Sequence, residues 1–179
     1  MAKALTILVE GFEEIEAVTI IDVLRRAGVE VVSAGLAAGP VRGSHEIAVS
    51  AEVALDAARA PDFDALVLPG GMPGAATLRD EPRVQRVVRE FSEHGKLIAA
   101  ICAAPIALEA AGVLHGRQAT SYPGNPLPSA RYSEESVVED GPVITSRAAG
   151  TAFAFALRLV ERLVSKEEAE RQRVKLLLS

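Results

Sequence analysis

LIAAICAAP, at residues 97–105, is the stretch of sequence that decides the fold. It begins as a short apolar run of the kind that forms a buried parallel strand. It continues into an alanine-rich segment that is typical of a helix ending at Gly112. Because proline is tolerated only in the first turn of a helix, Pro105 predicts a helix start at about residues 103–105. Cys102 therefore lies at the junction between a strand and a helix.

Cys102 is the only cysteine of the chain. A strand-to-helix turn presents its residue at the carboxyl edge of a parallel sheet, where such sheets carry their chemistry. The unpaired N–H groups and the dipole of the following helix favour a thiolate over a thiol. The sequence thus predicts an activated nucleophile. A lone cysteine in an apolar run is also typical of an ordinary core residue, and the sequence alone leaves both interpretations open.

The composition is that of a soluble globular protein. Of its residues, 49% are hydrophobic and 24% are charged. The length of 179 residues is that of one domain, residues 1–179, which can bury a full core. A net charge of −5 argues against nucleic acid and anionic membranes as partners, and no apolar run reaches the ~18 residues of a membrane span. One cysteine and three scattered histidines exclude an internal disulfide and argue against a metal site. We expect a cytoplasmic protein without a signal peptide or a metal.

Apolar strands alternate with helical segments along the chain. Strands are predicted from residue 97 and at residues 3–9, 29–34 and 64–68, with hairpins at residues 40–50 and 136–146. Helices are predicted at residues 13–27, 82–94, 103–112, 151–164 and 166–178. The first helix is expected to bury one face made of Ile15, Val18, Ile21 and Leu24. This alternation predicts an α/β fold with a mostly parallel sheet covered on both faces.

Glutamates at the start of the first helix are the candidate partners of Cys102. Glu13 and Glu16 are three residues apart and share one helical face, and the preceding strand ends at the same sheet edge as Cys102. Glu16 is flanked by apolar residues, and a carboxyl held in such surroundings can keep its proton and donate a hydrogen bond to a thiolate. Glu14 is expected to be solvated. Exposed glutamates that merely complement the helix dipole are the alternative for all three.

The loop PGGMPG, at residues 69–74, directly follows a predicted strand. Its glycines would let the backbone approach a ligand and could form an anion-binding nest, although an ordinary turn has the same composition. His94 and His115 lie beside glycines at the ends of elements and are expected at the surface. His45 could approach the sheet edge that carries Cys102. Since no histidine adjoins Cys102 in the sequence, a cysteine–histidine pair is not predicted locally.

Four separated motifs occur in the order of a known family. They are GFEEIE at residues 11–16, LPGG at 68–71, AAICA at 99–103 and TSR at 145–147. Together they resemble the ThiJ/PfpI superfamily, specifically its parkinsonism-associated deglycase branch and the bacterial relatives of that branch. The resemblance covers essentially the whole chain. It implies a flavodoxin-like three-layer sandwich of the class I glutamine amidotransferase type, with a nucleophile elbow, and a homodimer.

The resemblance also implies roles for individual residues. Cys102 would be the reactive thiol and Glu16 its hydrogen-bonding carboxylic acid, with no cofactor. The amides of Gly71 and Ala103 would hold an oxyanion or a sulfinate. The other residues implied for the pocket are Glu13, Gly70 and Tyr122.

The activities known in the family give the functional hypotheses. The first is a glyoxalase III-type enzyme acting on reactive α-oxoaldehydes, or a deglycase acting on early glycation adducts of proteins, with protection against oxidative stress. The alternative is a redox sensor or holdase chaperone that uses a Cys102 sulfinate and has little catalysis. A cysteine peptidase or other hydrolase is a weaker alternative. The implied partners are a small carbonyl substrate or a glycated protein.

Three positions depart from the family pattern. The peptidase branch places a histidine directly after the cysteine, whereas this chain has Ala103, which argues against proteolysis. Relatives of the human type carry a histidine in the loop after the cysteine helix, and the matching position here is Tyr122. The sequence leaves open whether Tyr122 or His45 replaces that histidine. The usual Gly-Pro-Gly-Thr run is AAGT at residues 148–151.

Overall fold

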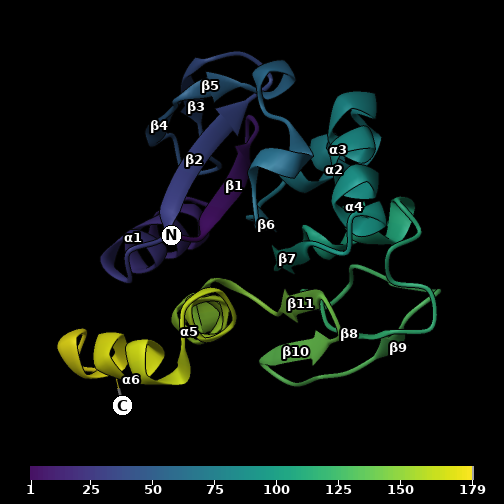
Figure 1. Ribbon diagram of the computed structural model, residues 1–179. Helices are drawn as coiled ribbons and strands as arrows, with labels where there is room; N and C mark the ends of the chain where they lie inside the picture. The colour runs from purple at the N-terminus through teal and green to yellow at the C-terminus, as the bar shows by residue number, and fades with distance from the viewer. Residues whose placement is uncertain (179) are drawn as a thin grey trace.

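The computed structural model describes residues 1–178, which are built around one seven-stranded sheet (Figure 1). The strand order is β10-β11-β7-β6-β1-β2-β5. Neighbouring strands are parallel except β10 and β11. The strands of this sheet are β1 (Lys3–Leu8), β2 (Glu30–Gly35), β5 (Val53–Ala54), β6 (Ala65–Leu68), β7 (Leu97–Ile101), β10 (Val137–Asp140) and β11 (Val143–Ser146).

The most apolar strands occupy the middle of the sheet. Every residue of β6 and β7 is buried, as expected for parallel strands that are covered on both faces. The predicted hairpins are also present, one formed by β3 (Gly39–Arg42) and β4 (Ala48–Ala51), the other by β10 and β11. The strands predicted from the sequence are therefore confirmed.

Helices cover the two faces of the sheet (Figure 1). On one face lie α1 (Glu14–Arg26), α5 (Ala152–Leu163) and α6 (Lys166–Lys175). On the other lie α2 (Gly74–Asp80), α3 (Pro82–Glu93) and α4 (Pro105–Ala110). Separate apolar clusters fill the two spaces between sheet and helices, one of which contains Phe155 and the other Phe91. The predicted three-layer sandwich is confirmed.

The buried face of α1 differs from the prediction. Ile15 is 59% exposed and Val18 is 49% exposed, whereas the buried stripe runs through Glu16, Ala17, Ile20, Val23 and Leu24. Of the predicted face, Leu24 is buried and Ile21 is partly buried. The buried stripe includes Glu16, which accepts a hydrogen bond from the N–H of Gly70, and Ile15 and Val18 lie outside this stripe. Two apolar side chains at the start of α1 are thus left uncovered.

Several short elements carry no pattern that the sequence could reveal. They are α2, β5, β8 (Gln118–Ala119), β9 (Arg131–Tyr132) and the 3-10 turns η1 (Leu55–Ala57), η2 (Ala60–Asp62) and η3 (Ala149–Thr151). Strands of two residues are too short to show alternation. Within residues 1–178, no helix combines the length and the apolarity needed to cross a membrane.

Candidate active site

Cys102 occupies a strained turn between β7 and α4. Its backbone has a φ of 63°, a left-handed conformation that is uncommon for a residue with a side chain. Two hydrogen bonds hold it there. The Cys102 N–H donates to the carbonyl of Ser146 at 2.9 Å, and the N–H of Tyr122 donates to the Cys102 carbonyl at 2.7 Å. This is the geometry of a nucleophile elbow, in which a tight turn lifts one side chain away from the sheet.

The Cys102 side chain is half-buried. Three groups act on the sulfur, namely the Glu16 carboxyl and the backbone N–H groups of Ala103 and Gly71. A cysteine of the ordinary core would be surrounded by aliphatic groups alone. The interpretation of Cys102 as a simple core residue therefore does not describe its surroundings.

Glu16 is the most deeply buried acid near the thiol. Its side chain has no solvent exposure, and its Oε2 accepts a hydrogen bond of 2.7 Å from the N–H of Gly70. Its Oε1 has no hydrogen-bond partner in the described part of the chain. Burial raises the pKa of Glu16 to about 7, against the opposing effects of the Gly70 N–H and the Cys102 thiol. Glu16 therefore holds a proton over part of the neutral range.

The surroundings of Cys102 do not favour the thiolate in the way that the sequence predicted. Burial raises the pKa of Cys102 to about 12, the negative charge of Glu16 adds to this, and the N–H groups of Ala103 and Gly71 lower it only in part. The helix that was expected to stabilise the thiolate, α4, begins only at Pro105, which has no N–H to offer the sulfur. When the proton lies on Glu16, the negative charge of Glu16 disappears and no longer raises the pKa of Cys102, so only burial opposes the two N–H groups. Cys102 and Glu16 therefore titrate as a pair.

Gly70 and Gly71 are required by the close packing of this site. A Cβ atom on Gly70 would lie 2.7 Å from the Cys102 Cβ and 2.8 Å from the Glu16 Oε2. Gly71 has a φ of 93°, and a Cβ atom there would lie 2.4 Å from the backbone nitrogen of Glu13. The Glu13 N–H in turn donates to the Gly70 carbonyl at 2.8 Å. The glycines let this loop reach both the acid and the thiol.

Glu14 is buried, contrary to the prediction that it is solvated, and only 5% of it is exposed. The loop between β3 and β4 folds over the start of α1, and Glu14 accepts hydrogen bonds from the N–H groups of His45 at 2.7 Å and Ile47 at 3.3 Å. Burial alone would raise the pKa of Glu14, but hydrogen bonds from its own N–H and from His45 and Ile47 lower it to about 2. Glu14 is therefore a structural carboxylate that fastens the loop to the helix.

His45 and Tyr122 lie at different places around the site. The His45 ring, 69% exposed, has its Nδ1 3.1 Å from Glu14 and 3.6 Å from Glu13. Tyr122 contacts the cysteine turn through its backbone, and its side chain is exposed. Among residues 1–178, neither ring is hydrogen-bonded to the Cys102 sulfur. His94 is at the surface, as predicted.

One set of side chains could hold a metal ion. The ligand atoms of Glu13, Glu14 and His45 lie within 4.8 Å of one another. The Oε1 of Glu14 accepts both backbone hydrogen bonds, from His45 and Ile47. Its Oε2 is hydrogen-bonded to the His45 ring and to the Ser44 hydroxyl. A metal ion would have to displace these contacts. In this structure the three side chains instead belong to the hydrogen bonds that join the loop between β3 and β4 to the start of α1.

Sequence reasoning missed Ser146. Its carbonyl holds the Cys102 N–H, and its hydroxyl donates to the carbonyl of Ser136 at 2.7 Å and contacts Thr151 at 2.6 Å. Ser146 lies in the TSR motif, but the motif alone does not show that Ser146 binds the Cys102 backbone. This contact follows from the pairing of β11 with β7, which places Ser146 beside Ile101.

The sheet and the cysteine turn define an α/β sandwich protein of the nucleophile-elbow class. Within that class, the chain belongs to the DJ-1/PfpI family, whose model matches residues 2–162. This confirms the family that the sequence motifs indicated.

Several relatives are similar to most of the chain. The Parkinson disease protein 7 homolog of Danio rerio is 43% identical over 98% of this chain and 97% of its own length. The glutathione-independent glyoxalase DJR-1.2 of Caenorhabditis elegans is 36% identical over 89% of this chain and 87% of its own. The crystal structure of Drosophila melanogaster DJ-1beta superposes with a TM-score of 0.95 at 40% identity, covering 99% of this chain and 98% of that one.

Proposed function

We propose that this chain is a cofactor-free enzyme that converts reactive α-oxoaldehydes such as methylglyoxal, or their early adducts on proteins, into hydroxy acids. The supporting observation is the Cys102–Glu16 pair, a half-buried thiol beside a fully buried acid whose pKa is raised to about 7. An acid with a pKa near the working pH is suited to both giving and taking a proton. A relative of similar length carries the name of a glutathione-independent glyoxalase.

The proposed reaction begins with addition of the sulfur to the aldehyde. The Cys102 thiolate forms a C–S bond with the aldehyde carbon, and the electron pair of the carbonyl moves to its oxygen. The N–H groups of Gly71 and Ala103, which act on the sulfur, would hold this oxyanion. Glu16 then supplies the proton that completes the hemithioacetal.

Glu16 is then free as a carboxylate to move a proton within the substrate. It removes the proton from the carbon bonded to sulfur and returns a proton to the neighbouring carbon, while the proton of the hemithioacetal hydroxyl moves to the former ketone oxygen. The hemithioacetal thereby becomes a lactoyl thioester. Water hydrolyses the thioester, releases lactate and restores the thiol. Methylglyoxal and water thus give lactate, and no external oxidant or reductant is consumed.

Turnover of methylglyoxal to lactate by purified protein tests this proposal. Cys102→Ala is expected to abolish turnover, and Glu16→Gln is expected to reduce it by at least about 100-fold, since general acid–base groups contribute about 10²–10⁴-fold. The matched control is Glu30→Gln, which removes an exposed carboxylate paired with Lys3. Turnover that survives in Cys102→Ala would refute the proposal.

The second candidate is a redox sensor or chaperone based on the same thiol. The supporting observation is that Cys102 is half-buried between two N–H donors and a protonatable acid, which can hydrogen-bond the oxygens of a sulfinate. Two equivalents of peroxide would oxidise the thiolate through sulfenate to sulfinate. A stable two-oxygen adduct with negligible methylglyoxal turnover would favour this candidate. A peptidase has no such support, because Ala103 follows the cysteine.

We also propose that the chain forms a homodimer through the start of α1. Ile15 and Val18 are exposed there, and Ile47, 58% exposed, is fastened nearby by its hydrogen bond to Glu14. A second copy would cover this apolar group beside the site. Val18→Asp is expected to shift the sedimentation coefficient to that of a monomer.

The thiol chemistry also fits the reducing cytoplasm expected from the sequence.

A further inference from the structure

Gln85 is a polar side chain on the buried face of α3, and it is 6% exposed. Its Nε2 donates one hydrogen bond of 3.1 Å to the Leu78 carbonyl and another of 3.0 Å to the Ala107 carbonyl. Because two carbonyls face this end of the amide, it must be the NH₂ group, which has two hydrogens to give. Leu78 belongs to α2 and Ala107 to α4. Gln85 therefore bridges two helices that are not its own.

The Leu78 carbonyl lies in the last turn of α2 and needs a donor from outside that helix. The N–H that would continue the helical pattern to it belongs to residue 82, which is a proline and has none. The Ala107 carbonyl already accepts from the N–H of Ala111 at 3.1 Å, so the bond from Gln85 is additional. The Oε1 of Gln85 is buried without a hydrogen-bond partner among residues 1–178, which offsets part of what the two bonds contribute to stability. The specific consequence of a glutamine here is the link between α2 and α4.

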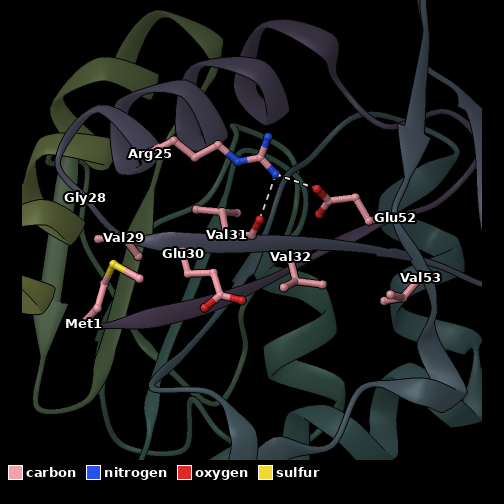
Figure 2. A pocket seen from close by; sticks show the side chains of 9 residues that line it. All are labelled: Met1, Arg25, Gly28, Val29, Glu30, Val31, Val32, Glu52 and Val53. Atoms are coloured by element: carbon pink, nitrogen blue, oxygen red, sulfur yellow. Dashed lines mark hydrogen bonds and ion pairs between the residues drawn. The ribbon is translucent and has the colours of Figure 1, made fainter.

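This bridge differs from side-chain bonds to the backbone at the surface. Figure 2 shows Arg25 of α1, which also donates to a backbone carbonyl, that of Val31 at 2.8 Å. The Arg25 side chain is 48% exposed in a groove beside β2, and the same nitrogen also donates to Glu52. Water can take the place of such an exposed donor. Loss of the buried Gln85 amide would instead leave the Leu78 carbonyl without the donor that it has now.

The two helices that Gln85 joins follow the two N–H donors of the cysteine site. α2 comes directly after the loop that contains Gly71, and the N–H of Ala75 donates to the Gly71 carbonyl at 2.8 Å. α4 follows the cysteine turn, and the N–H of Ile106 donates to the Ala103 carbonyl at 3.3 Å. The two helices lie in direct contact, beside α3 (Figure 1). A shift of α2 relative to α4 would therefore move one N–H donor relative to the other.

We propose that Gln85 is a positioning residue for the cysteine site. By joining α2 to α4, it keeps the N–H groups of Gly71 and Ala103 directed at one point beside the thiol sulfur. Both N–H groups lower the pKa of Cys102, and in the proposed reaction the same groups hold the oxyanion. Only this second effect rests on the proposed function. Since a hydrogen bond weakens steeply as its length and angle depart from the ideal, a small shift of either helix reduces both effects.

Alkylation of the single thiol by iodoacetamide tests this role without any substrate. Gln85→Met removes both donors and keeps a side chain of similar length, since methionine fills irregular space in a core. The alkylation rate is measured from pH 5 to 10 and compared with that of the wild type. Circular dichroism and melting temperature check that the variant is folded. If it is not, Gln85→Asn takes its place, because an amide that is one methylene shorter cannot span both carbonyls.

Gln172→Met is the matched control. Gln172 is also a buried glutamine, 2% exposed, whose Nε2 donates to the Arg26 carbonyl at 3.1 Å and to the Glu168 Oε1 at 2.6 Å. It joins α6 to the end of α1 on the opposite face of the sheet, so its loss removes similar bonds and leaves α2 and α4 untouched. Arg25→Met is a second control, which removes an exposed bond to a carbonyl.

The Gln85 variant is expected to react at least about tenfold more slowly than the wild type at pH 7, with the inflection of its rate profile moved to higher pH, because the thiolate loses two aligned donors. Both controls should keep the wild-type profile, even where their melting temperature falls. A folded Gln85 variant with the wild-type profile would overturn the proposal, and so would an equal slowing in Gln172→Met, which would reduce the effect to lost stability.

Turnover of methylglyoxal gives a second readout that rests on the proposed function. The Gln85 variant should lower kcat with KM nearly unchanged, because the oxyanion that the two N–H groups hold develops only during the reaction. A higher KM with kcat unchanged would contradict the positioning role. A wild type without turnover would refute the proposed function, and the alkylation rates would still decide the role of Gln85.

Discussion

Glu14 and Glu16 lie two residues apart at the start of α1, are both buried, and have pKa values displaced in opposite directions. Residues two apart on a helix point to nearly opposite sides. Glu14 therefore turns to the loop between β3 and β4, where backbone N–H groups stabilise its charge. Glu16 turns under the sheet edge, where it has one N–H donor, from Gly70, and burial favours its protonated form. One acid holds structure together and the other is poised for proton transfer.

Replacement of Glu16 by Gln should change how stability depends on pH. The folded-state pKa of about 7 lies above the ordinary value of 4.5, so the contribution of Glu16 is fully present below pH 4.5 and is lost as the pH rises through 7. The wild type should therefore lose about 2 kcal/mol relative to Glu16→Gln between pH 5 and 8. Urea unfolding at the two pH values measures this. An unchanged difference between the two proteins would show that Glu16 titrates normally.

Replacement of Glu14 by Gln should have the opposite pH dependence. Its folded-state pKa of about 2 lies below 4.5, so its contribution is present above pH 4.5 and is lost as the pH falls toward 2. At pH 7 the variant should be less stable by about 1–2 kcal/mol, and the difference should shrink in acid. Glu10→Gln is the control, because Glu10 is exposed and accepts one backbone hydrogen bond, of 3.2 Å, from Arg42. Equal losses for both variants at pH 7 would contradict a special role for Glu14.

Gly70→Ala should disable the site even though it adds only a methyl group. The new Cβ would overlap both Cys102 and Glu16, and a displacement of about 1 Å in an active site can cost about 100-fold in rate. Methylglyoxal turnover is expected to fall by that order. Gly150→Ala is the matched control, since a Cβ there would have no neighbour within 4 Å. Comparable activity in both variants would mean that the packing around Gly70 is not needed.

Oxidation of Cys102 should depend on the acid beside it. With mild peroxide, the wild type is expected to stop at the two-oxygen sulfinate, because the proton of Glu16 can hydrogen-bond one of its oxygens. Shortening the acid in Glu16→Asp withdraws that proton and should allow the three-oxygen sulfonate to accumulate. Intact mass spectrometry distinguishes the two products. The same product ratio in both proteins would remove Glu16 from the redox hypothesis.

The sequence was sufficient to predict the sheet and the cysteine turn because their signals are local. The apolar runs of β6 and β7 and the position of Pro105 are visible without any knowledge of tertiary contacts. Glu14 was predicted wrongly because its partners, His45 and Ile47, are 31 and 33 residues away. Ile15 and Val18 were wrongly placed on the buried face of α1, whereas Leu24 was placed correctly. The local pattern could not show that Glu16 is buried against Gly70, 54 residues away.

The chemical state of Cys102 also depends on distant groups. The sequence predicts a thiolate from the helix that follows, whereas burial and Glu16 oppose ionisation of the thiol. The assignments of Gly71, Ala103, Glu13 and Tyr122 to a substrate pocket stay predictions. They rest on the family resemblance and on positions around the turn, and turnover by variants is the way to test them.

The account rests on the claim that Cys102 and Glu16 share one proton. Since Cys102 is the only cysteine, the rate at which iodoacetamide alkylates the chain reports on this thiol alone. Measured from pH 5 to 10, the wild-type rate should rise through an inflection near the pKa of Glu16, about 7, and Glu16→Gln should lack that inflection. Rate profiles that superpose for the two proteins would contradict the claim.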